Sequence, residues 1–334
     1  MGPRVVAETR QLPIMHPATR PLSPGTRIFV AGHRGLVGSA LWRHFTAHGF
    51  RNLIGRTSTE LDLRDARATS AFFEETRPDV VIAAAARVGG IGVNASRPVE
   101  FISDNLRIQV NLLDSAVANG VGRFLFLGSS CAYPRLAQQP IREDMLFTGP
   151  LEVTNESYAA AKLAGIAHLV AIRRQYRLPY ICAMPTNIYG PDDNFDPLTG
   201  HVLPAMIRRF HKAARDGTPS VTCWGTGRPR REFMHADDLA DACHFLLDHY
   251  DEKPLINVGT GEDISIAELA ESVAKVVGYH GEIRWDPSKP DGTPRKLLDV
   301  QRINDLGWRA TISLVEGVRA TYEWFLDHQD DCRA

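Results

Sequence analysis

The fold is decided by the stretch RIFVAGHRGLVG, which occupies residues 27–38. Its first five residues predict a short strand, and the segment from Ser39 to His48 predicts a helix. Between them lies a G-x-x-G-x-x-G loop made by Gly32, Gly35 and Gly38. In such a loop the first glycine permits a tight turn, the second lets the backbone approach a pyrophosphate, and the third lets helix and strand pack closely. A pyrophosphate is also favoured by the free N–H groups of the helix start. The pattern indicates a dinucleotide site, although a glycine-rich turn without a ligand has the same sequence.

A second strand, residues 52–55, ends at Arg56, and another arginine, Arg34, lies inside the glycine loop. A site for NAD(H) would place Asp or Glu after the second strand to bind the ribose 2′-hydroxyl. Two guanidinium groups suit a 2′-phosphate instead. We therefore expect NADP(H), with Asp62 and Leu63 near the adenine. The alternative is that both arginines point into solvent and bind no phosphate.

Strands and helices alternate as far as residue 188, which predicts an α/β fold with a doubly wound parallel sheet. The expected elements are strands at 80–84, 124–127 and 180–184, and helices from Pro98 to about Asn119 and from Asn155 to Arg174. Residues 27–188 are then a nucleotide-binding domain, and 189–334 are mainly a substrate-binding domain from which the chain can cross back. Residues 1–26 contain five prolines and predict a disordered leader.

Composition excludes several classes of partner. Lys and Arg number 38 against 39 Asp and Glu, which argues against nucleic acid. The chain has no run of about 18 apolar residues, so we expect no membrane span. Its five cysteines form no C-x-x-C pair, so we expect neither a metal site nor a disulfide framework. Reduced thiols fit the cytoplasm.

Candidate reactive groups lie directly after the strand at 124–127 and in the helix that follows it. Tyr158 and Lys162 lie four residues apart across three alanines, and so share one face of a helix. A neighbouring ammonium lowers the pKa of a phenol and favours proton exchange. Ser129 and Cys131 follow a strand end, where ligands of open α/β sheets bind. Two alternatives remain open at this point: Tyr158 and Lys162 can be an ordinary pair on an amphipathic helix, and Cys131 can be a small thiol packed in the core.

Later in the chain, His201 precedes a helix expected at 203–215, and a strand at 220–224 leads into the Arg- and Gly-rich loop 225–231. That loop suits a nucleotide diphosphate, or is an exposed basic loop. The segments starting at Ser265 and Ser313 each carry Glu three residues later and predict helix starts through capping boxes.

Together, the glycine loop, a serine after the strand at 124–127, and Y-x-x-x-K resemble the extended short-chain dehydrogenase/reductase family, over residue 27 to the C-terminus. The stretches AGHRGLVGS (31–39), LGSSC (127–131), PTN (185–187) and KPDGTPRK (289–296) are similar to one branch of that family. Members of this branch epimerise GDP-4-keto-6-deoxy-D-mannose at C3 and C5 and reduce C4 with NADPH. They are usually homodimers that pack through helices of the nucleotide domain.

The resemblance implies the following roles. The reductase triad is Ser129, Tyr158 and Lys162, and the epimerisation base and acid are Cys131 and His201. The residues expected to line the NADP(H) site are Gly32, His33, Arg34, Gly35, Leu36, Val37, Gly38, Arg56, Asp62, Leu63, Leu127, Lys162, Pro185, Thr186, Asn187, Ile188 and His201. Those expected to face the GDP-sugar are Arg209, Trp224, Arg231 and Asp291.

Four other functions share this scaffold. A sugar-nucleotide 4,6-dehydratase would need a carboxylate in the segment 129–133, which has none. A UDP-hexose 4-epimerase keeps NAD bound and has no need of the two arginines. Another NADP-dependent nucleotide-sugar epimerase/reductase, or a non-catalytic NADP(H)-sensing protein, is the remaining alternative.

Overall fold

The computed structural model describes residues 20–329 and is built around a six-stranded sheet. The sheet has the order β10–β5–β4–β3–β1–β2, and every neighbouring pair is parallel. Its strands are β1 (Ile28–Ala31), β2 (Leu53–Ile54), β3 (Val80–Ala83), β4 (Arg123–Leu127), β5 (Tyr180–Pro185) and β10 (Leu255–Val258). Every residue of β1, β3 and β5 is buried, as expected for strands covered on both faces.

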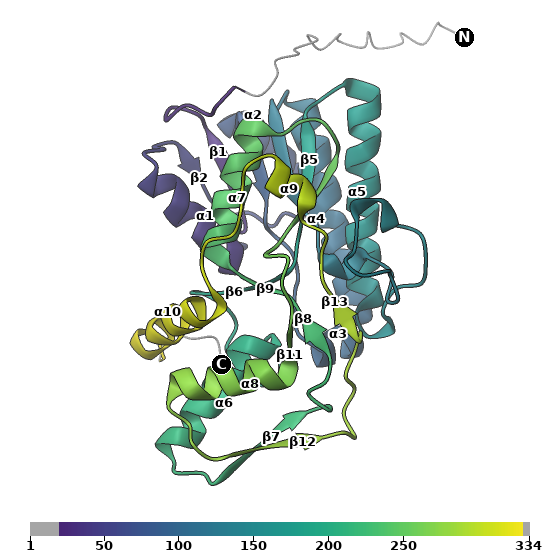
Figure 1. Ribbon diagram of the computed structural model, residues 1–334. Helices are drawn as coiled ribbons and strands as arrows, with labels where there is room; N and C mark the ends of the chain where they lie inside the picture. Colours follow the sequence, from purple (N-terminus) through teal and green to yellow (C-terminus); the bar gives the residue numbers. More distant parts are fainter. Residues whose placement is uncertain (1–19, 330–334) are drawn as a thin grey trace, which may run out of the picture.

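Helices pack on both faces of this sheet (Figure 1). On one face α1 (Leu36–Ala47) packs against α7 (Ala236–His249). On the other lie α2 (Ala66–Thr76), α4 (Pro98–Ala118) and α5 (Glu156–Tyr176), with the short α3 (Ile91–Ser96) before α4. The doubly wound parallel sheet expected from the alternating pattern is confirmed.

A smaller α/β part lies below the sheet in Figure 1 and has a separate hydrophobic core. Its helices are α6 (Val202–Arg215), α8 (Ile266–Val277) and α10 (Leu314–Asp327). Its strands pair as β7 (Ser220–Trp224) with β12 (Glu282–Asp286), as β11 (Ile264–Ser265) with β8 (Arg230–Arg231) and β13 (Arg295–Lys296), and as β6 (Asn187–Tyr189) with β9 (Phe233–His235). The strand at 220–224 and both capping boxes lie where the sequence places them.

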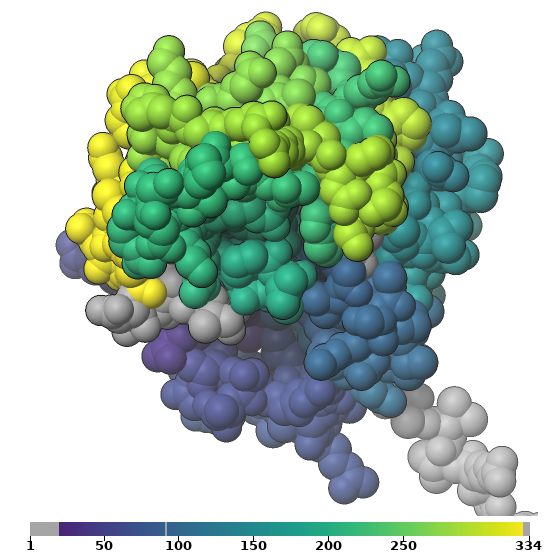
Figure 2. Space-filling model, turned by 90° about the horizontal axis from the view of Figure 1, so that it is seen from below, coloured from purple at the N-terminus to yellow at the C-terminus, as the bar shows by residue number. Residues whose placement is uncertain are grey.

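The chain crosses back to the six-stranded sheet after the smaller part has begun. Helix α7, strand β10 and the short α9 (Gln301–Asp305) all belong to the layer around that sheet. The buried carboxylate of Glu232 joins these crossovers, because it accepts the N–H groups of Thr260 at 2.7 Å, Gly261 at 2.8 Å and Leu298 at 2.9 Å. The two parts meet at a recess in the surface, between the green and the purple-to-blue atoms of Figure 2.

Residues 20–26 lie against the nucleotide-binding part, although their prolines had suggested a leader. The N–H of Leu22 donates to Asp248 Oδ1 at 2.7 Å, and the N–H of Arg51 donates to the carbonyl of Pro24 at 3.2 Å. Leu22 also packs on the main core, which gives this segment an apolar anchor. The rest of the expected leader, residues 1–19, lies outside the described residues. No helix between residues 20 and 329 is long and apolar enough to cross a membrane.

Candidate active site

The glycine loop joins β1 to α1, and two of its three glycines admit no side chain. Gly32 has a φ of 82°, and a Cβ there would lie 2.8 Å from the backbone of Ala85. A Cβ on Gly38 would overlap the carbonyl oxygen of Gly32. At Gly35 the nearest atom to such a Cβ is 3.5 Å away and belongs to the loop itself, so the backbone is open on its outer side. The loop therefore fits a pyrophosphate seated against Gly35 at the start of α1.

Two exposed arginines, Arg34 and Arg56, lie beside this loop. Hydrogen bonds from Thr57 lower the pKa of the nearby Glu60 carboxyl, and the charges of Arg56 and Arg34 add to this effect. The guanidinium carbon of Arg56 also lies 5.5 Å from the centroid of the Phe72 ring, over its face. Both cations thus share one neighbourhood at the carboxyl edge of the sheet, a geometry that fits a 2′-phosphate.

Other expected cofactor contacts near the first two strands already have partners in the protein. The His33 ring packs on Trp42 with centroids 5.3 Å apart, while its buried Nδ1 has no hydrogen-bond partner among the described residues. The Asp62 carboxylate pairs with Arg64 at 2.8 Å, and Leu63 is half-buried. A contact of Asp62 with the cofactor would therefore compete with this ion pair.

Beyond β4 the chain enters a short 3₁₀ turn, η1 (Ser130–Ala132), that holds the first candidate reactive groups. The Oγ of Ser129 caps the turn by accepting the N–H of Cys131 at 3.1 Å. Leu127, at the end of β4, is buried. The cap fixes the Ser129 oxygen, and the one hydroxyl hydrogen can be donated to a neighbouring group.

Tyr158 and Lys162 lie on α5 as expected, but their electrostatics differ from the expectation. Lys162 is buried and donates to the carbonyl of Leu127 at 2.7 Å, and its Nζ is 5.8 Å from the centroid of the Tyr158 ring. Burial lowers the pKa of Lys162 to about 8. The pKa of Tyr158 is raised by burial and by the charge of the Cys131 thiolate, against the effect of a hydrogen bond with Ser129. The shift of the Tyr158 pKa is therefore opposite to the expected one, and the Lys162 ammonium is directed at the carbonyl of Leu127.

A residue that the sequence analysis did not single out, Lys296, completes the surroundings of Cys131. Its Nζ donates to the Cys131 Sγ at 3.4 Å. Burial by itself would raise the pKa of Cys131. The pKa is nevertheless lowered, because Lys296, a hydrogen bond from Ser129 and the charge of Arg231 favour the thiolate. This is the electrostatic environment of a reactive thiol. Lys296 belongs to the stretch 289–296 that carried the family resemblance, but nothing in its neighbouring sequence indicates that it lies beside Cys131.

His201 is the N-cap residue of α6 and lies on the other part of the molecule from Cys131. Its pKa is lowered, first by desolvation and then by the positive charge of Lys296. The residue is nevertheless exposed to solvent. Lys296 thus contacts the thiol directly, and its charge also reaches the imidazole of His201.

The segment 185–188 bridges β5 and β6 next to the crossovers. Thr186 Oγ1 and Asn187 Nδ2 both donate to the carbonyl of Glu232, at 3.1 and 2.7 Å. Pro185 is the last residue of β5, and Ile188 is the central residue of β6. These residues are therefore held at the carboxyl end of the sheet, where a cofactor expected at the glycine loop would extend.

The four residues expected to face the substrate are spread over the smaller part. Arg231 is half-buried and near Cys131. Trp224 is 49% exposed, with Lys289 Nζ 5.8 Å from its ring centroid. Asp291 is held by Thr226, whose N–H and Oγ1 donate to its two oxygens at 2.7 and 2.8 Å. Asp291 therefore fastens the loop after Trp224.

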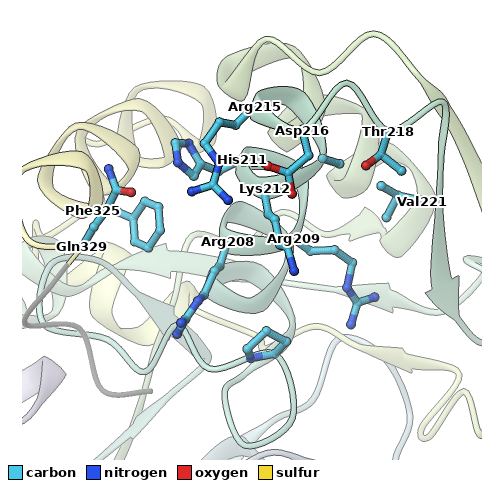
Figure 3. Close-up of a pocket in the computed structure, with 12 residues that line it drawn as sticks. Arg208, Arg209, His211, Lys212, Arg215, Asp216, Thr218, Val221, Phe325 and Gln329 are labelled. Atoms are coloured by element: carbon cyan, nitrogen blue, oxygen red, sulfur yellow. Dashed lines mark hydrogen bonds and ion pairs between the residues drawn. The ribbon is translucent and has the colours of Figure 1, made fainter.

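Arg209 donates to the carbonyl of Thr222 at 3.2 Å and lines a cavity of about 480 Å³ beside α6. Figure 3 shows Arg208, Arg209 and Lys212 extending from this helix in different directions. One guanidinium nitrogen of Arg208 is buried without a hydrogen-bond partner in the described part of the chain. The cavity is thus strongly basic, but none of the five candidate catalytic residues lines it.

Comparison with known proteins gives concordant results. Residues 28–259 match the model of the NAD dependent epimerase/dehydratase family. The chain is 53% identical to the probable GDP-L-fucose synthase 1 of Oryza sativa subsp. japonica over 91% of this chain and 93% of that protein. It is 51% identical to the GDP-L-fucose synthase of Escherichia coli (strain K12), over 92% of this chain and 98% of that protein. A crystal structure of a GDP-L-fucose synthetase from Naegleria fowleri bound to NADP has a TM-score of 0.88 and 28% identity, over 95% and 99% of the two chains.

Proposed function

The chain belongs to the NAD dependent epimerase/dehydratase family, and from this we infer that it is an NADPH-dependent GDP-L-fucose synthase. It epimerises GDP-4-keto-6-deoxy-D-mannose at C3 and C5 and reduces C4, giving GDP-L-fucose. The observation that carries this assignment is Lys296, which contacts Cys131 and whose charge acts on His201, with Ser129 and Tyr158 next to Cys131. A reductase alone would have no use for a thiolate and an imidazole at the same sugar.

Epimerisation uses the acidity of the two carbons that flank the C4 ketone. The Cys131 thiolate, favoured by Lys296, takes a proton from C3 or C5, and the electron pair moves into an enolate. Ser129 and Tyr158 donate hydrogen bonds to the enolate oxygen, where negative charge develops. The His201 imidazolium returns a proton to the opposite face of the same carbon, which inverts it. Solvent then reprotonates the imidazole and takes up the proton from the thiol.

Reduction uses the same oxygen. When bound, NADPH would supply a hydride to C4, and Tyr158 would deliver a proton to the oxygen. We assign the pyrophosphate to the open backbone at Gly35 and the 2′-phosphate to Arg34 and Arg56, since those groups fit the cofactor. Lys162 holds the end of β4 through Leu127, next to the site of both reactions.

The nucleotide of the substrate extends from this site along α6. His201 and Arg209 are eight residues apart at the start and middle of that helix, or about 12 Å along its axis. A sugar beside His201 therefore places the diphosphate and base within reach of Arg209, with Arg231 nearer the sugar. Trp224 offers an exposed ring to the base, and Asp291 positions its loop.

We also propose a cytoplasmic homodimer that packs through α4 and α5. The four cysteines described between residues 20 and 329 are free thiols, as expected in a reducing compartment. Val99 and Val110 on α4 are 68% and 38% exposed, which leaves apolar surface for a second subunit. Light scattering on the purified protein tests the dimer.

The reaction is tested with GDP-4-keto-6-deoxy-D-mannose in deuterated water, with and without NADPH. We expect deuterium at C3 and C5 without NADPH, and oxidation of NADPH with formation of GDP-L-fucose when it is added. Cys131→Ala should stop deuterium uptake. Reduction without any uptake of deuterium would show a plain 4-reductase and overturn the assignment.

A further inference from the structure

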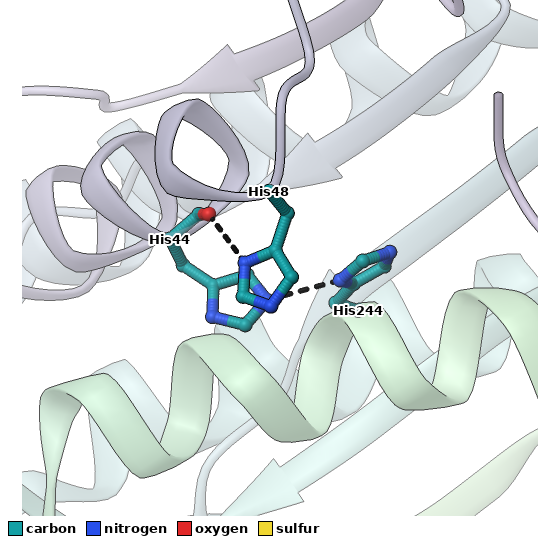
Figure 4. A group of neighbouring side chains, drawn as sticks. All are labelled: His44, His48 and His244. Carbon is teal, nitrogen blue, oxygen red and sulfur yellow. Dashed lines mark hydrogen bonds between the residues drawn. The ribbon is translucent and has the colours of Figure 1, made fainter. Parts of the chain in front are cut away.

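Three histidines form a cluster at the end of α1 that is farthest from the glycine loop (Figure 4). His44 lies in the last turn of α1, His48 is the residue that caps this helix, and His244 faces them from α7. One ring nitrogen from each of the three lies within 4.8 Å of those of the other two. His44 Nε2 and His244 Nδ1 are 3.0 Å apart and share one hydrogen bond.

Two of the rings have their second nitrogen held by an acceptor on the protein. The Nδ1–H of His48 donates to the carbonyl of His44 at 2.8 Å, which leaves Nε2 with a free lone pair. His244 Nε2 lies 3.5 Å from Asp248 Oδ2, which leaves its Nδ1 directed at His44. Carboxylates and carbonyls orient metal-binding histidines in this way and make them more basic.

The charge state of the cluster also suits a cation. Carboxylates of α7 lie near two of the three rings, Asp237 and Asp241 near His44, and Asp241 and Asp248 near His244, and they favour positive charge there. Arg43 is the nearest cation on α1, and its guanidinium is already paired with Asp192 and Asp237, each at 2.9 Å.

We propose that His44, His48 and His244 bind one divalent transition-metal ion of the class that prefers imidazole, with Zn²⁺ or Ni²⁺ as examples. Zn–N bonds of about 2.0–2.1 Å in a tetrahedral site place two nitrogens about 3.3 Å apart. The pair of His44 and His244 already has nearly this separation, at 3.0 Å. His48 is exposed, so a small rotation of its side chain can bring its Nε2 to the ion. Water completes the coordination on the solvent side.

The ion would have a structural role that does not depend on the proposed function. The glycine loop is at the first turn of α1 and the cluster at its last, separated by about 15 Å along the helix. Helix α7 reaches α1 only after the chain has passed through part of the smaller domain. A metal held by both helices would therefore cross-link the first helix of the nucleotide domain to the crossover that returns from the substrate side.

The test is a titration of the tag-free, full-length protein with Co²⁺ and Zn²⁺, followed by absorption spectroscopy and calorimetry. We expect one ion per chain, a visible Co²⁺ band, and no thiolate charge-transfer band, which would report Cys131 instead. His48→Ala, which replaces an exposed side chain, should weaken affinity at least about 10- to 100-fold. His244→Asn should do the same, and His280→Ala, an exposed histidine of the smaller part, should change nothing.

Metal should also raise the midpoint of thermal unfolding of the wild type, by about 4 °C at a hundredfold excess over Kd. That rise should be absent in His48→Ala, whose own unfolding midpoint without metal should equal that of the wild type. Absence of binding at micromolar metal, or binding that both cluster variants retain, would overturn the proposal. Neither result would bear on the epimerase and reductase activities, which are measured without added metal.

Discussion

Replacing Lys296 by Met tests the electrostatic basis of the proposed epimerisation. The Nζ of Lys296 lies 3.4 Å from the Cys131 sulfur and also acts on His201. Methionine keeps most of the side-chain volume but removes the charge. The variant should therefore bind substrate in the same site, with a thiol that ionises less readily.

The distance sets the size of the effect. Two unit charges 3.4 Å apart attract by about 1 kcal/mol in water and by about 5 kcal/mol at an effective dielectric constant of about 20. Each 1.4 kcal/mol corresponds to about a tenfold change in an equilibrium. Since Cys131 is only half-buried, we take the lower part of this range. The thiolate population at neutral pH should fall about tenfold, and the epimerisation rate with it.

The pH profile separates this effect from a loss of binding. Lys296 lowers the pKa of both Cys131 and His201, so its removal should raise both values. Both limbs of the profile for deuterium uptake without NADPH should then move to higher pH, and activity should recover in alkaline solution. Lys275→Met, at an exposed lysine of α8, is the matched control. A slower reaction whose two limbs keep their positions would refute the reasoning and assign Lys296 to substrate binding.

Three further predictions follow from the same site. Tyr158→Phe should abolish NADPH oxidation while deuterium uptake falls less, because Ser129 still stabilises the enolate oxygen; equal losses in both assays would contradict separate roles. Arg34→Ala combined with Arg56→Ala should raise KM for NADPH about tenfold or more and leave KM for NADH unchanged; parallel changes for the two cofactors would show that neither arginine binds the 2′-phosphate. Burial lowers the pKa of Lys162 from 10.5 in the unfolded chain to about 8 in the folded protein. Between pH 8 and 10.5 the unfolded chain therefore binds more protons than the folded one, and the free energy of unfolding of the wild type rises with pH, by about 3 kcal/mol in total. Lys162→Met without cofactor should therefore be more stable than the wild type at pH 7, with a gap in denaturant unfolding that narrows toward pH 10; a constant gap would show that the ammonium is not desolvated.

Local sequence patterns predicted the parts of the fold that depend on neighbours in the chain. The strand–glycine loop–helix unit at residues 27–47 needs a few adjacent residues, and so do the capping boxes at Ser265 and Ser313. The strand at 220–224 was bounded by Pro and Gly and was found with the same ends. In contrast, nothing in residues 255–258 shows that they pair with β5 in the first sheet, because their partner is more than 70 residues away.

In the candidate site, too, the sequence predicted what depends on neighbouring residues and missed contacts between distant ones. Spacing alone placed Tyr158 and Lys162 on one helix face, and a strand end placed Ser129 and Cys131 at the sheet edge. Lys296 was missed as a partner of Cys131, because 165 residues separate the two. The histidine cluster was missed for the same reason, since 200 residues separate His44 and His244. Pairs of this kind depend on how distant elements pack.

The direction of the Tyr158 pKa was wrong for an instructive reason, and the structure gives it a better role. A phenol that delivers a proton must start protonated, and burial together with the Cys131 thiolate ensures this by raising its pKa. In the proposed mechanism, Cys131 becomes neutral when it takes a proton from the sugar, and its repulsion of a phenolate then disappears. Tyr158 is then a stronger acid while the enolate oxygen needs a donor, and a weaker one when the thiolate is restored. In the proposed epimerisation, the acidity of Tyr158 is thus set by the charge on the Cys131 sulfur rather than by the lysine one turn away.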